Sequence, residues 1–397
     1  MEILQIANKA TFPPDGGSLA ILSLARGYVK NSHQVYLLNM ETPKHFNNPG
    51  LLEPEIKDKL LVHGVRVNTH LSMIKLGLNL LFSNKPYIAQ RFISSKYTRA
   101  LKKLISVKSF DIIQVEGLYM LQYIRIIKKN FSKKIIYRPH NIEHKIWERN
   151  AQETRSFIKR IYFKNMARRL KKLELSLLNS YDYLLPISPA DAEIYTDLGN
   201  TKPVCITPFG IDFQKLPTPQ PGNPQQNIIF IGALDWIPNQ KGITWFIDHC
   251  WDKLLETGLQ TELLIAGRNA PGWLVDFLTN KPGIKYLGEI DNAHDFMIHN
   301  GPLIVPLFSG SGLRVKIIEA MALKKSILST TIGAEGIPYT DKKNIIIANN
   351  ADEFIRGIKL LTNEQDTCLK IGEEASKLAA ENFDLEKIAH KVLNFIN

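Results

Sequence analysis

Short apolar runs alternate along the chain with longer segments of helical period, and this alternation restricts the fold more than any other feature. The runs are continuously apolar, which is typical of strands that are covered on both faces. They lie at 3–7, 34–38, 112–115, 135–137, 183–185, 228–231, 263–266, 285–287, 303–305, 326–328 and 344–347. Strands that alternate with helices predict an α/β fold built from parallel sheets.

The segment 215–226 divides this pattern. It contains four prolines and a glycine, which neither continue a helix nor pair well in a sheet. A chain of 397 residues also has the length of about two domains. We therefore predict that this segment is a surface connection between two domains and that a new strand begins at Asn227. The last segment, 379–397, again has a helical pattern.

The charge is unevenly distributed. Residues 1–200 hold 31 Lys and Arg against 16 Asp and Glu, a net charge of +15, whereas residues 201–397 hold 19 against 22, a net charge of −3. This asymmetry indicates an anionic partner for the first half, either a membrane surface or a nucleic acid.

No segment has the length and apolar character of a membrane-spanning helix. The nearest run, 71–82, is interrupted by Lys75 and is shorter than the ~18 residues that a span needs. The N-terminus lacks the basic start of a signal peptide and predicts a strand that begins at once. Three distant cysteines form no CxxC pair, so neither a disulfide framework nor a cysteine zinc site is expected. We predict a cytoplasmic protein.

Two glycine-containing loops follow predicted strands. Gly16 and Gly17 precede a helical pattern at 19–28, and they fit either a loop that binds an anion or a tight turn. The segment 308–321 is more informative, because Arg314 and Lys316 add positive charge at the start of a helix. Glu319 follows one to two turns later, where it could accept hydrogen bonds from a diol. The pattern favours binding of a nucleoside diphosphate through its phosphates and ribose.

Seven strings of residues in this order resemble a known family. They lie at 138–144, 187–191, 208–212, 232–239, 266–268, 309–321 and 333–336, and read RPHNIEH, ISPAD, PFGID, GALDWIPN, AGR, SGSGLRVKIIEAM and GAEG. The series resembles the retaining GT-B glycosyltransferases of family 4, and in particular the sugar transferases of bacterial polysaccharide assembly. The resemblance covers nearly the whole chain.

The resemblance implies a GT-B fold, in which two Rossmann-like parallel-sheet domains face a cleft. We expect an N-terminal acceptor domain over 1–210 and a C-terminal nucleotide-sugar domain over 211–379. The helix at 380–397 should pack back on the first domain.

The resemblance also implies roles for the loop and helix at 309–321. Glu319 occupies the place of the carboxylate that holds the ribose, and the donor-binding loop is Gly310, Ser311, Gly312 and Leu313. A second glutamate of the wider family is replaced by Ser311. The family's phosphate-binding arginine is replaced by Ala233, with Lys241 an uncertain substitute for its lysine. We infer that Arg314 and Lys316 neutralise the diphosphate as catalytic residues.

Other residues are assigned roles because they match positions in the family's sequence motifs. Gly16 and Gly17 match a loop that approaches the transferred sugar, and His140 matches a histidine near that sugar whose catalytic role we leave open. Arg268 is a candidate for binding the donor near its base.

Glu116 and Tyr119 follow the strand at 112–115 and are candidate acceptor contacts. We interpret Trp236, Trp245 and Trp251 as core residues rather than sugar-stacking ones.

No metal is expected. His140 and His144 fit the spacing H-x-x-E-H of zinc hydrolases, but they follow a strand and a proline, which favours a loop over the helix that such a site needs. The chain has no Asp-x-Asp motif, and cationic side chains with a helix end can neutralise a leaving diphosphate instead.

The segment 155–172 holds eight basic residues and no acidic one. Its apolar side chains recur at helical spacing, so it is either a core-packed helix with a solvated basic face or a patch for anionic phospholipid. The candidate membrane patch is Arg160, Lys164, Arg168 and Lys171. Nucleic acid is not expected, because no aromatic residues are interleaved for stacking.

The resemblance therefore implies a retaining hexosyltransferase. We expect the donor to be a UDP- or GDP-sugar, the acceptor to be a glycan or lipid-linked glycan, and the enzyme to be cytoplasmic or peripheral on the inner face of the cell membrane. A nucleotide-sugar epimerase or a phosphorylase of the same fold stays open, as does a non-catalytic basic module that binds membranes.

Overall fold

The computed structural model describes residues 1–13, 15–48, 50, 54–217, 227–310 and 312–397. These residues form two units: unit 1 is Met1–Gly210 with Leu385–Asn397, and unit 2 is Ile211–Asp384. The expected connection at 215–226 lies outside the described residues from 218 onward. The helix that returns to unit 1 begins at Leu385 and not at residue 380, because the preceding helix continues to Asn382.

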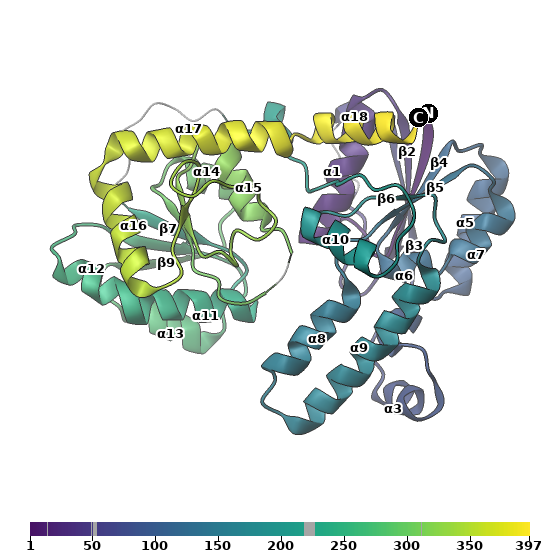
Figure 1. Cartoon of the computed structure of the whole chain (residues 1–397), viewed down its shortest axis with the longest axis horizontal. Coiled ribbons are helices and arrows are strands. Elements are labelled where there is room, and N and C mark those ends of the chain that lie inside the picture. Colours follow the sequence, from purple (N-terminus) through teal and green to yellow (C-terminus); the bar gives the residue numbers. More distant parts are fainter. Residues whose placement is uncertain (14, 49, 51–53, 218–226, 311) are drawn as a thin grey trace. The chain divides into compact units, whose positions relative to one another are not determined.

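Unit 1 contains a six-stranded, wholly parallel sheet (Figure 1). Its strands, in the order in which they lie in the sheet, are β3 (Leu60–Arg66), β2 (Gln34–Glu41), β1 (Glu2–Ala7), β4 (Ile112–Glu116), β5 (Lys134–Arg138) and β6 (Tyr183–Leu184). Its helices are α1 (Gly16–Lys30), α2 (Pro54–Lys57), α3 (Met73–Phe82), α4 (Tyr87–Gln90), α5 (Ser95–Val107), α6 (Leu118–Leu121), α7 (Ile124–Asn130), α8 (Glu143–Glu153), α9 (Phe157–Leu177), α10 (Pro189–Asp197) and α18 (Leu385–Ile396).

Both faces of this sheet are buried, as the continuous apolar runs predict. On β1, Ile3 joins a core cluster with α1 and α18, whereas Leu4 and Ile6 join a second cluster with α5 and α7. Successive side chains of a strand point to opposite faces, so a strand between two helical layers is apolar at most positions on both faces.

The sequence analysis missed β3. This strand lies at the edge of the sheet, and its apolar run at 60–62 is followed by exposed His63 and Gly64, so only its first part has the pattern by which the other strands were predicted.

Unit 2 contains a second six-stranded parallel sheet. Its strands, in the order in which they lie in the sheet, are β12 (Ile346–Ile347), β11 (Ile327–Ser329), β10 (Leu303–Val305), β7 (Ile228–Ile231), β8 (Leu263–Ala266) and β9 (Ile284–Gly288). Its helices are α11 (Ile237–Phe246), a π-helical turn (Ile247–Trp251), α12 (Asp252–Glu256), α13 (Gly272–Thr279), α14 (Ala293–Ile298), α15 (Val315–Ala322), α16 (Ala351–Asn363) and α17 (Gln365–Asn382), with a 3₁₀ turn at Phe213–Lys215.

The two sheets have the same winding. In each, the first three strands of the unit run outward in one direction from its first strand, and the next three run outward in the other. The order reverses between β1 and β4 in unit 1 and between β7 and β10 in unit 2. In doubly wound sheets, ligands bind at the carboxyl ends of the strands beside this reversal.

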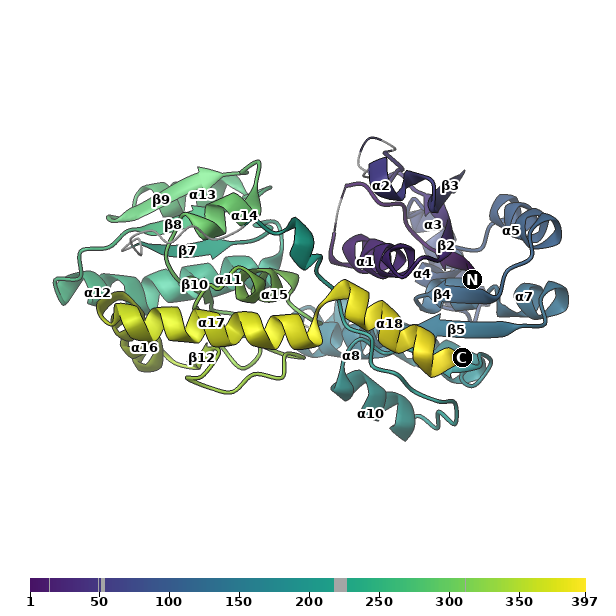
Figure 2. The same cartoon turned by 90° about the horizontal axis from the view of Figure 1, so that it is seen from above.

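Helix α18 packs closely on α1, beside which it lies in Figure 2. A Cβ atom at Gly27 of α1 would stand 2.5 Å from the Leu385 carbonyl oxygen and 2.7 Å from the Ala389 Cβ. The absence of a side chain at Gly27 therefore sets the distance between the two helices.

We expect Gly27→Ala to lower the free energy of unfolding by ~1–3 kcal/mol, because the added methyl group forces α18 away from α1. Gly16→Ala is a matched control in the same helix, since a Cβ there meets no atom within 4 Å. Urea denaturation of both variants tests this, and equal stability of the two would contradict the packing.

Candidate active site

The loops after β7 and β10 meet at the reversal point of the unit 2 sheet. The loop after β10 contains Gly310 and Gly312, whose φ angles of +110° and +88° favour glycine. A Cβ at Gly310 would also stand 2.9 Å from the Trp236 ring, which follows β7. The two glycines thus let the backbone of one loop lie directly against the other.

Arg314 joins the two loops. Its Nη1 donates a 2.8 Å hydrogen bond to the Gly312 carbonyl oxygen, and its guanidinium lies 5.3 Å from the centre of the Trp236 ring. The side chain is only 7% exposed. These contacts hold a permanent positive charge at the start of α15, where the helix dipole also favours an anion.

Lys316 lies at the carboxyl end of β7. Its Nζ donates to the Ile231 carbonyl oxygen at 2.9 Å and to Asn239 Oδ1 at 3.4 Å. A Cβ at Gly232 would stand 3.2 Å from this Nζ. Burial, together with the nearby Arg314 charge, lowers the pKa of Lys316 to about 7. Binding of an anion beside it would restore the charged form.

Glu319 follows on the same side of α15 as Lys316, three residues later, and its side chain is 24% exposed. His294 of α14 approaches it, with 3.5 Å between His294 Nε2 and Glu319 Oε1. The hydrogen bond to this carboxylate raises the pKa of His294 above its usual value. The carboxylate is therefore accessible and has His294 as a neighbour.

The other donor residues predicted in unit 2 lie on several elements. Lys241 is exposed on α11, and Arg268 follows β8, where its carbonyl oxygen accepts from the Leu234 amide at 2.9 Å. Leu313 is half-buried beside Arg314. Ser311 lies outside the described residues.

In unit 1, Gly16 and Gly17 form the first turn of α1 rather than a loop before it. Asp15 caps the helix, because its side chain accepts from the Ser18 amide at 2.8 Å and Ser18 bonds back to Asp15. Burial raises the pKa of Asp15, but hydrogen bonds from His45 and Lys9 outweigh it and hold the pKa well below its usual range. The predicted helix start at residue 19 was therefore three residues late.

A buried polar network lies at the carboxyl ends of β4 and β5. Glu116 and Arg138 end these strands in register and have no exposed side-chain surface. Arg138 donates to the Ala20 carbonyl oxygen at 3.0 Å and to those of Thr207 and Pro208 at 3.3 Å. Its role in the string 138–144 is therefore structural.

His140 is attached to this network. Its Nε2 lies 2.5 Å from Glu116 Oε2, and its side chain is 17% exposed. Burial raises the pKa of Glu116, but the Arg138 charge and the hydrogen bond from His140 outweigh this effect and lower the pKa overall. Glu116 is therefore an ionised carboxylate, which can only accept a hydrogen bond. Nε2 of a neutral His140 must then be the donor. Burial lowers the pKa of His140 despite Glu116. The ring is thus held neutral, with Nδ1 as its acceptor.

The placement of Glu116 corrects its interpretation as an acceptor contact. The residue is 1% exposed, and its carboxylate faces His140, Arg138 and Gln114 rather than solvent. Glu116 positions His140.

Tyr119 contacts a second pair of carboxylates, Glu143 and Glu174, through Glu143. Its hydroxyl donates to Glu143 Oε2 at 2.7 Å, and its ring is stacked on Phe92. Glu174 of α9 accepts from the Glu143 amide and bonds the ring of buried His144. Burial raises the pKa of Glu143 to about 7, with the Glu174 charge adding to the effect against the hydrogen bond from Tyr119. Glu143 can therefore exchange a proton near neutral pH.

The two histidines of the H-x-x-E-H spacing do not form one site. His140 precedes α8 and pairs with Glu116, whereas His144 lies within α8 and pairs with Glu174. Among the described residues, no group of three or more His, Cys, Asp or Glu side chains is arranged to hold a metal ion.

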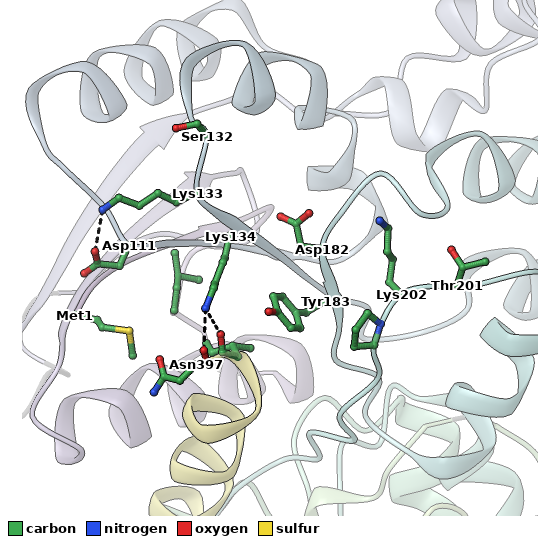
Figure 3. Close-up of a pocket in the computed structure, with 13 residues that line it drawn as sticks. Met1, Asp111, Ser132, Lys133, Lys134, Asp182, Tyr183, Thr201, Lys202 and Asn397 are labelled. Carbon is green, nitrogen blue, oxygen red and sulfur yellow. Dashed lines mark hydrogen bonds and ion pairs between the residues drawn. The ribbon is translucent and has the colours of Figure 1, made fainter.

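A pocket of about 1020 Å³ lies at the amino ends of β4, β5 and β6, which are Ile112, Lys134 and Tyr183 (Figure 3). Lys133 bonds Asp111 at its rim, and Lys134 bonds the Ile396 carbonyl. This is the edge of the sheet opposite to Glu116 and His140, so we do not place the active site there.

Sequence reasoning missed several residues of these sites. Trp236 was interpreted as a core residue, but it is 36% exposed and its ring packs against the Arg314 guanidinium. Trp251 is fully buried, as expected. Asn239, His294 and Glu143 had no assigned role. Only the position of Trp236 and Asn239 within the string 232–239 could have drawn attention to them.

Part of the chain matches the model of a known family. Residues 225–364 match the family described as "Glycosyl transferases group 1". An uncharacterized 44.6 kDa protein in the cps region of Klebsiella pneumoniae is 23% identical over 329 residues, which cover 80% of this chain and 81% of that protein.

Two solved structures share the fold of the whole chain. Sucrose-phosphate synthase from Thermosynechococcus elongatus has a TM-score of 0.70 at 14% identity, and the match covers 99% of this chain and 98% of that one. HepE from Anabaena, solved with UDP-glucose, has a TM-score of 0.68 at 14% identity with the same coverage. The fold is GT-B. Together with the domain match, it supports a glycosyltransferase.

Proposed function

We propose that the protein is a retaining glycosyltransferase of family 4, which transfers a hexosyl group from a nucleoside diphosphate sugar to a glycan acceptor. One observation carries the proposal: Arg314, Lys316 and Glu319 are brought together at the carboxyl end of the unit 2 sheet. Two cations followed by an accessible carboxylate suit a diphosphate and the ribose diol next to it. The HepE structure with UDP-glucose supports a nucleotide-sugar donor.

In this proposal, unit 2 binds the donor and unit 1 binds the acceptor. Arg314 and Lys316 stabilise the charge that grows on the leaving diphosphate, so that no metal is needed. The bond between the anomeric carbon and the phosphate oxygen breaks, and the acceptor oxygen bonds to the same face of that carbon. The acceptor proton passes to the departing phosphate. Configuration is thereby retained.

The acceptor is proposed to be a lipid-linked glycan in the assembly of cell-surface polysaccharide, at the cytoplasmic face of the membrane. The place of the Klebsiella pneumoniae relative in a cps region supports this context. Tyr119 and Glu143, whose side chains meet in a 2.7 Å hydrogen bond, are the proposed acceptor contacts.

The test has two steps. Thermal shifts with UDP-, GDP- and ADP-sugars identify the donor, because a bound ligand raises the stability of the folded protein. The release of free nucleoside diphosphate is then measured with and without lipid-linked glycan, in the presence of EDTA. We expect release only with acceptor and undiminished by EDTA. An altered sugar without any acceptor would instead indicate an epimerase, and no turnover with any donor would contradict an enzyme.

We expect Glu319→Gln to weaken donor binding by about 10- to 100-fold with the fold intact, since hydrogen bonds to a charged acceptor contribute roughly 1.5–3 kcal/mol. Titration calorimetry measures this. His294→Asn is the matched control, because it removes the neighbour of Glu319 and leaves the carboxylate. Equal donor affinity of Glu319→Gln and the parent protein would remove Glu319 from the site.

A further inference from the structure

Large apolar side chains that face solvent in unit 1 are concentrated in two short segments. One is α3 with the residue before its cap, and the other is the first turn and a half of α9. The side chains, with their exposed fractions, are Leu71 (66%), Met73 (77%), Ile74 (77%), Leu78 (53%), Leu80 (36%) and Phe82 (81%), and then Phe157 (72%), Ile158 (80%) and Ile161 (55%).

Helix α3 is turned the opposite way from an ordinary surface helix, whose apolar side faces the core. Its inner side is held largely by polar groups: Asn79 is 6% exposed and bonds Gln90 and the Lys85 carbonyl oxygen. Arg169 of α9 donates to Asn79 Oδ1 and to the carbonyl oxygens of Asn79 and Leu80, at 3.0–3.1 Å. These hydrogen bonds fix the orientation of α3, so that the side chains of Met73, Ile74 and Leu78 face solvent.

The second segment lies at the tip of a helical hairpin. Helices α8 and α9 pack against each other through Trp147, whose ring centre is 5.5 Å from that of Phe163 and 6.1 Å from that of Tyr162. The hairpin turns between Glu153 and Phe157, so the first turn of α9 is its end. In Figure 1, the hairpin and α3 extend from the same side of unit 1.

The sequence around both segments is rich in positive charge, although Glu153, where the hairpin turn begins, is acidic and exposed. Residues 59–110 and 155–172 contain no Asp or Glu. The exposed basic side chains there include Lys75 and Lys85 around α3 and Arg155, Lys159, Arg160 and Lys164 around the hairpin tip. None of the described helices is long and apolar enough to cross a bilayer.

We propose that the outer side of α3 and the tip of the α8–α9 hairpin insert together into the surface of a bilayer that contains anionic lipid. Apolar side chains beside a rim of lysine and arginine are the composition of interfacial helices. The apolar groups enter the boundary between headgroups and acyl chains, and the rim contacts the phosphates. The surface includes the basic patch of α9 but is centred on the apolar side chains.

A second copy of the chain fits this surface less well. A twofold dimer would place the same face of both subunits together, and each face would bring its own positive rim. Lipid phosphates instead neutralise that rim. The inference is independent of the proposed glycosyl transfer, because it needs neither donor nor acceptor.

The test uses flotation of the full chain with vesicles of phosphatidylcholine, with and without phosphatidylglycerol. We expect the double variants Ile74→Ser/Leu78→Ser and Phe157→Ser/Ile158→Ser each to reduce vesicle binding by about tenfold or more, since each removes two apolar side chains from the lipid. Val107→Ser/Leu369→Ser is the matched control, because these residues are 66% and 52% exposed elsewhere. It should bind as the parent protein does.

Lys164→Glu/Lys171→Glu should reduce binding only to vesicles with phosphatidylglycerol. Thermal unfolding and donor binding of every variant should match the parent protein, which separates lost insertion from lost folding. Unchanged vesicle binding of both serine double variants would overturn the proposal. So would a parent protein that binds no vesicles but forms a dimer, by sedimentation equilibrium, that the serine variants dissociate.

Discussion

Arg314→Ala is expected to reduce kcat by about 10²–10³ and to raise the donor KM far less. The guanidinium is held by Trp236 and the Gly312 carbonyl oxygen before any ligand binds, so it stabilises charge that grows on the leaving phosphate without reorganising. Arg314→Lys should recover only part of the loss, because an ammonium cannot reproduce the planar two-point contact. Steady-state kinetics measure both.

Lys241→Ala is the matched comparison for Arg314→Ala. Lys241 is the rival candidate for the phosphate, but it is exposed on α11, whereas Arg314 is buried beside the end of β7. We expect a mild effect. A severe Lys241→Ala with a mild Arg314→Ala would show that the diphosphate binds to the other loop.

Donor affinity is expected to fall by up to ~50-fold between pH 7 and pH 9, through the titration of Lys316. The pKa of Lys316 is about 7 in the free protein, so the amine is mostly neutral above that pH. A bound diphosphate favours the ammonium form and raises the pKa. Above pH 7, donor binding is therefore coupled to protonation of Lys316, and the affinity for the donor decreases as the pH rises.

Lys316→Met should weaken donor binding at pH 6 by about 10²-fold and remove most of this pH dependence, because the charge is lost but the side chain keeps its length. Calorimetry in two buffers of different ionisation enthalpy measures the proton uptake directly. Lys241→Met serves as the control and should keep the parent profile. A pH profile of Lys316→Met that parallels the parent protein would assign the titration to another group.

The sequence alone was enough for the parallel α/β architecture. Strands β7 and β8 are buried at every position, and a continuous apolar run is a local property that needs no knowledge of neighbours. The glycine-containing segment before α15 was located for the same reason, because positive φ and helix capping are decided within a few residues. Strand β3 was missed because its apolar run at 60–62 ends at exposed His63 and Gly64.

The sequence could not decide what each side chain faces. The Lys316 amine meets the Ile231 carbonyl oxygen, 85 residues away, and burial there, together with the Arg314 charge, lowers the pKa of the lysine. Glu116 resembled an exposed strand end until Arg138 and His140 were found around it. The run 71–82 fitted a buried segment as well as an exposed one. Burial depends on contacts between distant residues, and the hydrogen bonds from Arg169 to α3 turn the apolar side of that helix outward.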